Sequence, residues 1–277
     1  MKTYVAPWDW HNTKIKVYPD GQNTITYADH SIFHHPDAAQ IIETETDTDR
    51  NEPDETEPAP TEPEKPDRER TDILKRVKDR VFDITYCNPW AYFLTVTFDP
   101  KETDSKDPQQ VMEKLNKWLD NRVQRDDLQY LLIPEYHKKG GIHCHALIND
   151  TLRLSDSGTV TVDGIKKPMR REKALKLGLP ETKLHTVYNV PQWKYGFSTA
   201  IPTYGEPAAL AVYMTKYVTK DLQKIFGRYY WSSRNITREP DTIYTDTDFE
   251  SAEGSVYRID ATGVRLKYES NITFIKR

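Results

Sequence analysis

The sequence lacks the features that mark membrane, secreted and nucleotide-hydrolysing proteins. No apolar run reaches the roughly 18 residues that a membrane helix needs. The first ten residues have no apolar segment of the kind found in secretory signals. Cys87 and Cys144 are too few for a disulfide framework, and no Gly-x-x-x-x-Gly-Lys-Ser/Thr loop occurs. These absences predict a protein of a reducing cytoplasm, with no membrane partner and no NTPase domain.

Charge is distributed unevenly along the chain. Residues 1–72 contain 7 Lys+Arg against 17 Asp+Glu, whereas residues 73–277 contain 32 against 26. Within the acidic part, residues 37–70 are rich in Glu, Asp, Thr and Pro, a composition that cannot bury enough apolar surface to fold. The basic remainder is compatible with nucleic acid but does not demonstrate it.

Four regions are therefore expected. Residues 1–36 form a weakly structured segment, with a short hairpin at Asp20-Gly21, and residues 37–70 form a disordered acidic linker. Residues 71–234 form the main domain, and residues 235–277 a β-hairpin extension. Inside the main domain, apolar periodicity predicts strands at 90–98, 128–135, 142–148 and 193–203. Helices are predicted from Thr71, at 108–125 and at 206–225, with residues 150–186 as an insertion.

A hairpin over residues 135–145 carries possible metal ligands. His143 and His145 are two positions apart in a strand, so their side chains share one face and Cys144 points to the other. Pairing across the turn can bring the Glu135 carboxylate beside them, and His137 competes with Glu135 as third ligand. Two imidazoles and a carboxylate suit a divalent ion such as Mg²⁺, Mn²⁺ or Zn²⁺. Neighbouring histidines also commonly line a polar groove, so His-x-His alone is a weak signal.

The helix predicted at 206–225 has an apolar stripe and an opposite face with tyrosines and lysines. At about 100° per residue, the apolar residues Ala211, Met214, Val218, Leu222 and Ile225 form the packed side. The opposite side carries Tyr213, Lys216, Tyr217, Lys220 and Lys224. A lysine one turn from a tyrosine can lower the pKa of the phenol and contact a phosphate. Tyrosine, lysine and a divalent metal together suit attack on a phosphodiester.

Two further stretches favour DNA contact without proving it. Lys166, Lys167, Arg170, Arg171, Lys173 and Lys176 lie within eleven residues. Such a run is either a solvated face or a phosphate-binding surface, and these two interpretations are about equally supported. Residues 228–234 are aromatic and basic.

Taken together, these motifs resemble the HUH endonucleases, and among them the rolling-circle replication initiators of small phages and plasmids. The apolar strand motif is matched by residues 93–98 and the metal motif by His143-Cys-His145, with Glu135 eight residues before it. The tyrosine motif is matched by Tyr213-x-x-Lys216-Tyr217-x-x-Lys220, which resembles two-tyrosine initiators. Cys144 departs from the family, where a bulkier hydrophobic residue is usual.

The resemblance implies an α+β fold, in which helices flank a central antiparallel sheet. It also implies nicking of single-stranded origin DNA with Mg²⁺ or Mn²⁺, a 5′-phosphotyrosine adduct, a free 3′-OH and later rejoining of ends. Tyr213 and Tyr217 would be nucleophiles aided by Lys216 and Lys220, with Glu135, His143 and His145 as metal ligands. Lys166, Lys167, Arg170, Arg171 and Lys224 are the DNA-binding candidates. A bacterial or archaeal host would supply helicase and DNA polymerase.

Two other functions stay open. An HUH transposase has the same order of motifs, whereas a relaxase usually places its tyrosine before the histidines. A catalytically silent DNA-binding repressor is the alternative from a different class, and the complete Tyr, His and Glu set argues against it.

Overall fold

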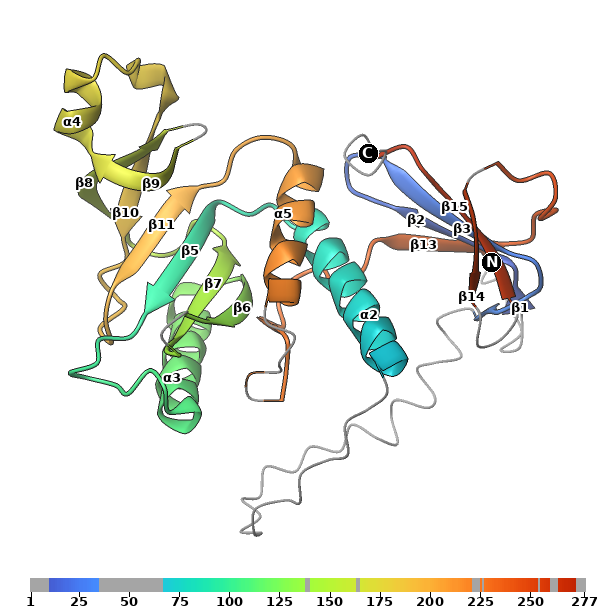
Figure 1. Ribbon diagram of the computed structural model, residues 1–277, viewed down its shortest axis with the longest axis horizontal. Coiled ribbons are helices and arrows are strands. Elements are labelled where there is room, and N and C mark those ends of the chain that lie inside the picture. Colours follow the sequence, from blue (N-terminus) through green and yellow to red (C-terminus); the bar gives the residue numbers. More distant parts are fainter. Residues whose placement is uncertain are drawn as a thin grey trace, which may run out of the picture. The chain divides into compact units, whose positions relative to one another are not determined.

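A computed structural model describes residues 10–34, 67–137, 140–162, 165–220, 225, 227–253, 255–259 and 264–272. The chain divides into a central unit, residues 71–238, and a terminal unit, residues 1–70 with 239–277. Antiparallel sheets and four described α-helices confirm the expected α+β class (Figure 1). None of the described helices is both long and apolar enough to span a membrane.

The central unit is built on an eight-stranded antiparallel sheet in the order β12-β6-β7-β5-β11-β10-β8-β9. Its strands are β5 (Tyr92–Thr97), β6 (Tyr130–Tyr136), β7 (Ile142–Ile148), β8 (Ser155–Val162), β9 (Ile165–Arg170), β10 (Leu184–Asn189), β11 (Ser198–Pro202) and β12 (Trp231–Ser232). Strand β7 lies between β6 and β5, so the hairpin predicted to hold a metal is inside the sheet rather than at an edge.

Helix α3 (Pro108–Asp126) covers one face of this sheet. The Asp107 side chain accepts hydrogen bonds from the backbone N–H groups of Gln109 and Gln110, which fixes the start of the helix. Asp127, in the left-handed region at φ 50°, ends it. The apolar core on this face includes Leu94, Val96, Val111, Leu115, Trp118, Cys144 and Ala146.

Helices α2 (Asp67–Tyr86) and α5 (Pro207–Lys220) belong to the opposite face. Their core contains Val81, Ile84, Leu131, Ile133, Leu147, Met214 and Val218. Because successive strand residues alternate between faces, Leu147 joins this core while its neighbour Ala146 joins the other. The sheet thus separates an α3 side from an α5 side, and His143 and His145 share the α5 side with Leu147.

Residues 150–186, which were expected to be an insertion, contribute strands to the main sheet. Strand β8 pairs with β10 and strand β9 pairs with β8, so both extend the main sheet. Val160 and Val162 of β8, two positions apart, are buried. The short helices α4 (Arg171–Lys176) and η2 (Glu181–Lys183) lie between β9 and β10.

Two helix boundaries also differ from prediction. Helix α2 begins at Asp67 rather than at Thr71. Helix α5 does not continue to Ile225, which instead forms a β-bridge with Arg228 across a turn at Gly227. Gly227 has φ 73°, a conformation that favours glycine and reverses the chain there. Leu222 and Lys224 lie outside the described residues.

The terminal unit joins the two ends of the chain in one sheet, with the order β13-β2-β3-β15-β14. These strands are β2 (Thr13–Val17), β3 (Asn23–Ala28), β13 (Asp241–Thr245), β14 (Ser255–Ile259) and β15 (Val264–Ser270). A separate pair is formed by β1 (Trp10–His11) and β4 (Phe33–His34). The hairpin predicted at Asp20-Gly21 joins β2 to β3.

Residues 1–36 and 235–277 were expected to be separate segments, but their described strands pair directly, β2 with β13 and β3 with β15. Pairing between these distant segments gives each of them neighbouring strands that it does not have by itself. Most of the acidic linker expected at 37–70 lies outside the described residues, and residues 67–70 are part of α2.

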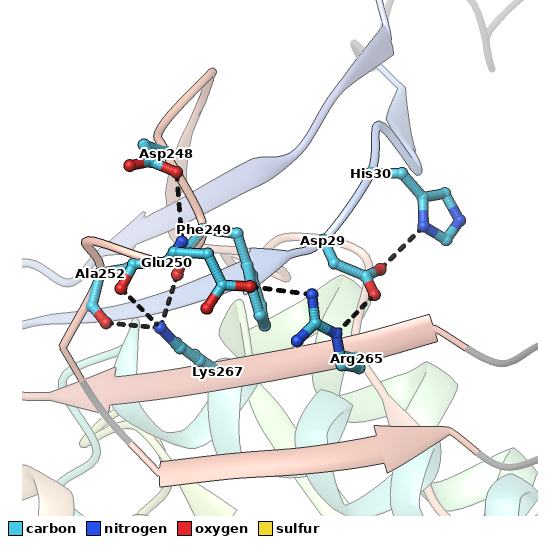
Figure 2. Close-up of polar contacts among 8 residues, drawn as sticks. All are labelled: Asp29, His30, Asp248, Phe249, Glu250, Ala252, Arg265 and Lys267. Carbon is cyan, nitrogen blue, oxygen red and sulfur yellow. Dashed lines mark hydrogen bonds and ion pairs between the residues drawn. The ribbon is translucent and has the colours of Figure 1, made fainter.

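A buried lysine organises one loop of the terminal unit (Figure 2). The ammonium of Lys267, 8% exposed, donates to the carbonyl oxygens of Phe249 at 2.5 Å, Ala252 at 2.9 Å and Glu250 at 3.3 Å. The guanidinium of Arg265 binds carboxylate oxygens of Asp29 at 3.1 Å and Glu250 at 2.9 Å. These bonds attach the loop at residues 248–252 to β15.

Candidate metal and tyrosine site

Three possible metal ligands converge on the β6–β7 hairpin of the central unit. The sheet register places Glu135 of β6 directly opposite His143 of β7, and His145 follows two positions later on the same face. Glu135 is 4% exposed, while the two histidines are part-buried. The interior position of β7 fixes both imidazoles, because strands on either side hold its backbone.

The separations of the ligand atoms are close to those that a single bound ion sets. The Nε2 atoms of His143 and His145 are 3.0 Å apart, and Glu135 Oε2 lies 3.7 Å and 3.3 Å from them. Two ligand atoms that each lie about 2.1 Å from one metal are separated by roughly 3.0–3.6 Å at ordinary coordination angles. Glu135, His143 and His145 are therefore compatible with a divalent metal ion.

His137, the competing third ligand, lies beside this group rather than in it. Its ring centroid is 5.8 Å from that of His143, and it is not part of the cluster of three ligand atoms. His137 instead lines a pocket of about 330 Å³ together with Lys106, Thr97 and His143.

Thr95 of β5 orients one ligand. Its Oγ1 lies 3.1 Å from Nδ1 of His145, which leaves Nε2 directed at the Glu135 carboxylate. A hydrogen bond at one ring nitrogen commonly fixes which nitrogen binds a metal. Alternation along β5 places Thr95 on one face with Phe93 and Thr97, but nothing in the sequence assigns it this contact.

Helix α5 presents Tyr217 to His145, and Tyr213 lies beside Tyr217. The rings of Tyr217 and His145 lie 4.4 Å apart, and the hydroxyls of Tyr213 and Tyr217 form a hydrogen bond of 2.5 Å. Phe93 packs against all three rings, at 5.6 Å from His145, 5.6 Å from Tyr213 and 5.9 Å from Tyr217. The tyrosine face of the helix thus lies at the possible metal site. Phe93 is a positioning residue that the sequence did not single out.

The electrostatics of Tyr217 differ from expectation. Burial, the hydrogen bond with Tyr213 and the negative charge of Glu135 raise the pKa of Tyr217 well above its ordinary value. The prediction that neighbouring lysines lower the pKa of this phenol is therefore wrong. The Tyr217 hydroxyl keeps its proton at neutral pH in this environment.

The lysines of the tyrosine motif are only partly described. Lys216 is exposed, and its ammonium lies 6.0 Å from the centre of the Tyr213 ring. The side chain of Lys220 and all of Lys224 lie outside the described residues. Lys216 is thus placed on the tyrosine side of α5, as the helical spacing predicts.

The basic run sits on the β9–α4 segment. Arg170 is exposed, whereas Arg171 forms an ion pair with Asp156 at 3.1 Å and donates to Thr186 Oγ1 at 2.8 Å. The side chains of Lys166 and Lys167 lie outside the description, and Lys173 and Lys176 are exposed. β9 is the edge strand farthest from β6 in the sheet order, so this run is separated from the metal ligands.

The aromatic and basic stretch at 228–234 occupies the opposite edge of the sheet. Arg228, Trp231 and Arg234 line a groove of about 850 Å³ with residues of α3. Trp231 packs against the core on the α3 side, whereas the metal ligands are on the α5 side. None of these three residues belongs to the cluster of candidate metal ligands.

The fold and this site define a class of protein in which an antiparallel sheet carries a possible metal-binding triad beside a helix with two tyrosines. Residues 91–222, which include β5, β6, β7 and α5, match the family described as Replication-associated protein ORF2. The match confirms the resemblance to replication initiators, and such a family implies origin DNA as the partner. It does not distinguish one-tyrosine from two-tyrosine members. No curated protein and no solved structure gives a match.

Proposed function

We propose that the protein nicks single-stranded origin DNA by tyrosine attack and later rejoins the ends. The observation that carries the proposal is the placement of Tyr217 against His145, with ring centroids 4.4 Å apart and Tyr213 hydrogen-bonded to Tyr217. A candidate nucleophile and a candidate metal cluster are thus neighbours on one sheet face. The family match to replication-associated proteins supports the same interpretation.

Each group of the site has a part in this reaction. Glu135, His143 and His145 hold the divalent ion, Mg²⁺ or Mn²⁺, and Thr95 orients the His145 ring. When bound, the ion supplies positive charge that polarises the scissile phosphate and stabilises the developing negative charge. Phe93 holds the tyrosine rings beside the histidines.

The covalent step exchanges one phosphodiester for another. A tyrosine Oη bonds to phosphorus, the bond from phosphorus to the 3′ oxygen breaks, and that oxygen leaves as a 3′-OH. The phenol proton leaves as the new bond forms, and the 3′ oxygen takes up one proton, so that no net proton is consumed. Because the two tyrosine hydroxyls are hydrogen-bonded, loss of the proton from one leaves the other to donate a hydrogen bond to the resulting phenolate. The reverse reaction rejoins the ends without a high-energy cofactor.

The lysines serve the phosphate. Lys216, on the tyrosine side of α5, offsets charge near Tyr213, and Lys220 occupies the equivalent spacing after Tyr217. Arg170 and the exposed lysines of the β9–α4 segment, with Lys166, Lys167, Arg171 and Lys224, bind phosphates farther along the strand. Unwinding and synthesis require a helicase and DNA polymerase from the host.

The test is covalent capture of DNA. The purified protein is incubated with Mn²⁺ and labelled single-stranded fragments that tile the replicon from which its gene derives, and adducts are resolved on a denaturing gel. We expect a labelled protein band that disappears in the Tyr213→Phe, Tyr217→Phe double variant. Single variants that each still cleave indicate two nucleophiles. Specific binding without any adduct would favour the silent repressor, and adducts only with transposon ends would favour a transposase.

A further inference from the structure

Phe197 is an apolar side chain displayed to solvent on the metal side of the central sheet. It is 72% exposed, the highest fraction among the exposed large hydrophobic side chains of the described residues. A single exposed apolar residue is ordinary on a protein surface and by itself needs no explanation. The position of this one in the sheet and the way its backbone is held make it different.

Sheet register aligns Phe197 with the metal ligands. Thr97 of β5 lies opposite His143, which in turn lies opposite Glu135. On the other side of Thr97, backbone hydrogen bonds run both ways to Phe197, at 2.9 Å and 3.1 Å. Residues paired directly across antiparallel strands point to the same face. Glu135, His143, Thr97 and Phe197 therefore form one row on the α5 side of the sheet. Phe197 lies about 10 Å from His143, two strand spacings away.

The backbone under Phe197 is held firmly. The carbonyl oxygen of Thr97 accepts from the Phe197 N–H and also from the Trp193 indole, at 3.1 Å each. Gly196, at φ 153°, lies so close to β5 that an added Cβ would sit 2.2 Å from the Thr97 carbonyl oxygen. A side chain at position 196 is therefore excluded, and Phe197 is kept in register with Thr97. The ring itself remains uncovered.

We propose that Phe197 is a stacking platform for a nucleobase of the DNA strand bound at the metal site. This inference rests on the proposed function, because it takes a single strand across the sheet face as given. An unpaired base exposes two apolar faces that gain by stacking on an aromatic ring, whatever its sequence. Phe197 supplies such a ring at a fixed distance from His143, so stacking would set which phosphate reaches Tyr213 and Tyr217.

Photo-crosslinking and binding test this assignment without requiring cleavage. The probe is a single-stranded oligothymidylate in which 5-iodouracil replaces the bases, mixed with full-length protein in EDTA and irradiated. Mass spectrometry of the digested complex should find the crosslink on the peptide that contains Phe197. Fluorescence anisotropy with labelled oligothymidylate should show Kd raised about 5- to 150-fold in Phe197→Ala. Phe197→Trp should bind at least as tightly as the natural residue.

The control is Leu177→Ala. Leu177 is also apolar and 61% exposed, but it lies at the end of α4 and not in the row that contains Phe197 and His143. We expect Kd to be unchanged in this variant, and both variants should melt at the temperature of the natural protein. If Phe197→Ala binds as tightly as the natural protein and no crosslink maps to Phe197, the stacking assignment is overturned. In that case an adduct with Mn²⁺ leaves the nicking proposal standing, whereas a protein that neither binds nor forms an adduct overturns both.

Discussion

The central and terminal units each bury a charged side chain, but they surround it differently. Lys267 of the terminal unit is enclosed by three backbone carbonyls, which satisfy the ammonium within the protein itself. Glu135 of the central unit faces two imidazoles, whose Nε2 atoms lie within 3.7 Å of its Oε2. Main-chain groups that enclose a charge fix a loop. Two imidazoles and a carboxylate that converge on one point can instead share a bound metal ion.

The largest effect that this comparison predicts comes from removing a ligand. His145→Ala should lower the rate of adduct formation by at least about 100-fold, since groups that only orient a ligand already cost 10- to 100-fold. Cys144→Ala is the matched control, because Cys144 is the preceding residue and points to the α3 core. Its adduct rate should stay within about twofold of the natural protein. A His145→Ala variant that reacts at the natural rate would show that the cluster is not the metal site.

The second effect concerns the enclosed lysine. Lys267→Met leaves buried carbonyl oxygens without their donor and should lower the stability of the terminal unit by about 1–3 kcal/mol. Hydrogen exchange of β15 amides measures this loss, while adduct formation by the central unit should be unaffected. Lys16→Met on β2, where the side chain is only half-buried, is the control. Equal exchange rates in both variants would contradict a structural role for Lys267.

A smaller effect follows from the orientation of His145. Thr95→Val keeps the shape of the side chain but removes the hydroxyl at 3.1 Å from His145 Nδ1. The affinity for Mn²⁺, measured by titration calorimetry, should fall about tenfold. Thr161→Val on β8 removes a hydroxyl from the same sheet but away from the ligands, and its affinity should not change.

The smallest effect is a pH dependence confined to the terminal unit. Partial burial opposes ionisation of Asp29, but hydrogen bonds from Arg265 outweigh it and hold the pKa of this carboxyl below its ordinary value. Hydrogen bonds from the Asn12 backbone and the His11 ring lower the pKa of Asp246. A lowered pKa in the folded state adds stability above the unfolded pKa, near 3.8, which is lost as pH falls through the folded value.

Hydrogen exchange of β2 and β3 should therefore speed up as pH falls from 5 to 3, after correction for the intrinsic exchange rate. The Asp29→Asn, Asp246→Asn double variant should show a weaker dependence, because both titrating groups are gone. An unchanged dependence in that variant would assign the acid sensitivity to other groups.

The placement of the candidate ligands could be predicted because it depends on local periodicity. His143 and His145 share a face in any strand, and a short turn at Gly140-Gly141 sets Glu135 opposite His143. The apolar residues Met214 and Val218 likewise predicted which side of α5 packs, but Tyr217 packs against the same core instead of lying on an opposite, accessible face.

Other features depended on contacts between distant residues, which periodicity does not reveal. The end of α5 before Ile225 follows from a bridge to Arg228, and the raised pKa of Tyr217 follows from burial against the sheet. The contact of Thr95 with His145 required the register of β5 on β7. The pairing of β2 with β13 joins opposite ends of the sequence, and no local pattern encodes it.

That last pairing has a consequence for the order in which the protein is made and folded. The ribosome completes residues 71–238 before β13 and β15 exist, so the terminal sheet closes only after its last strands emerge. Long sequence separation between paired strands slows such a step, whereas the contacts of the central unit are available earlier. The central unit is thus an insert within a discontinuous domain that is assembled last.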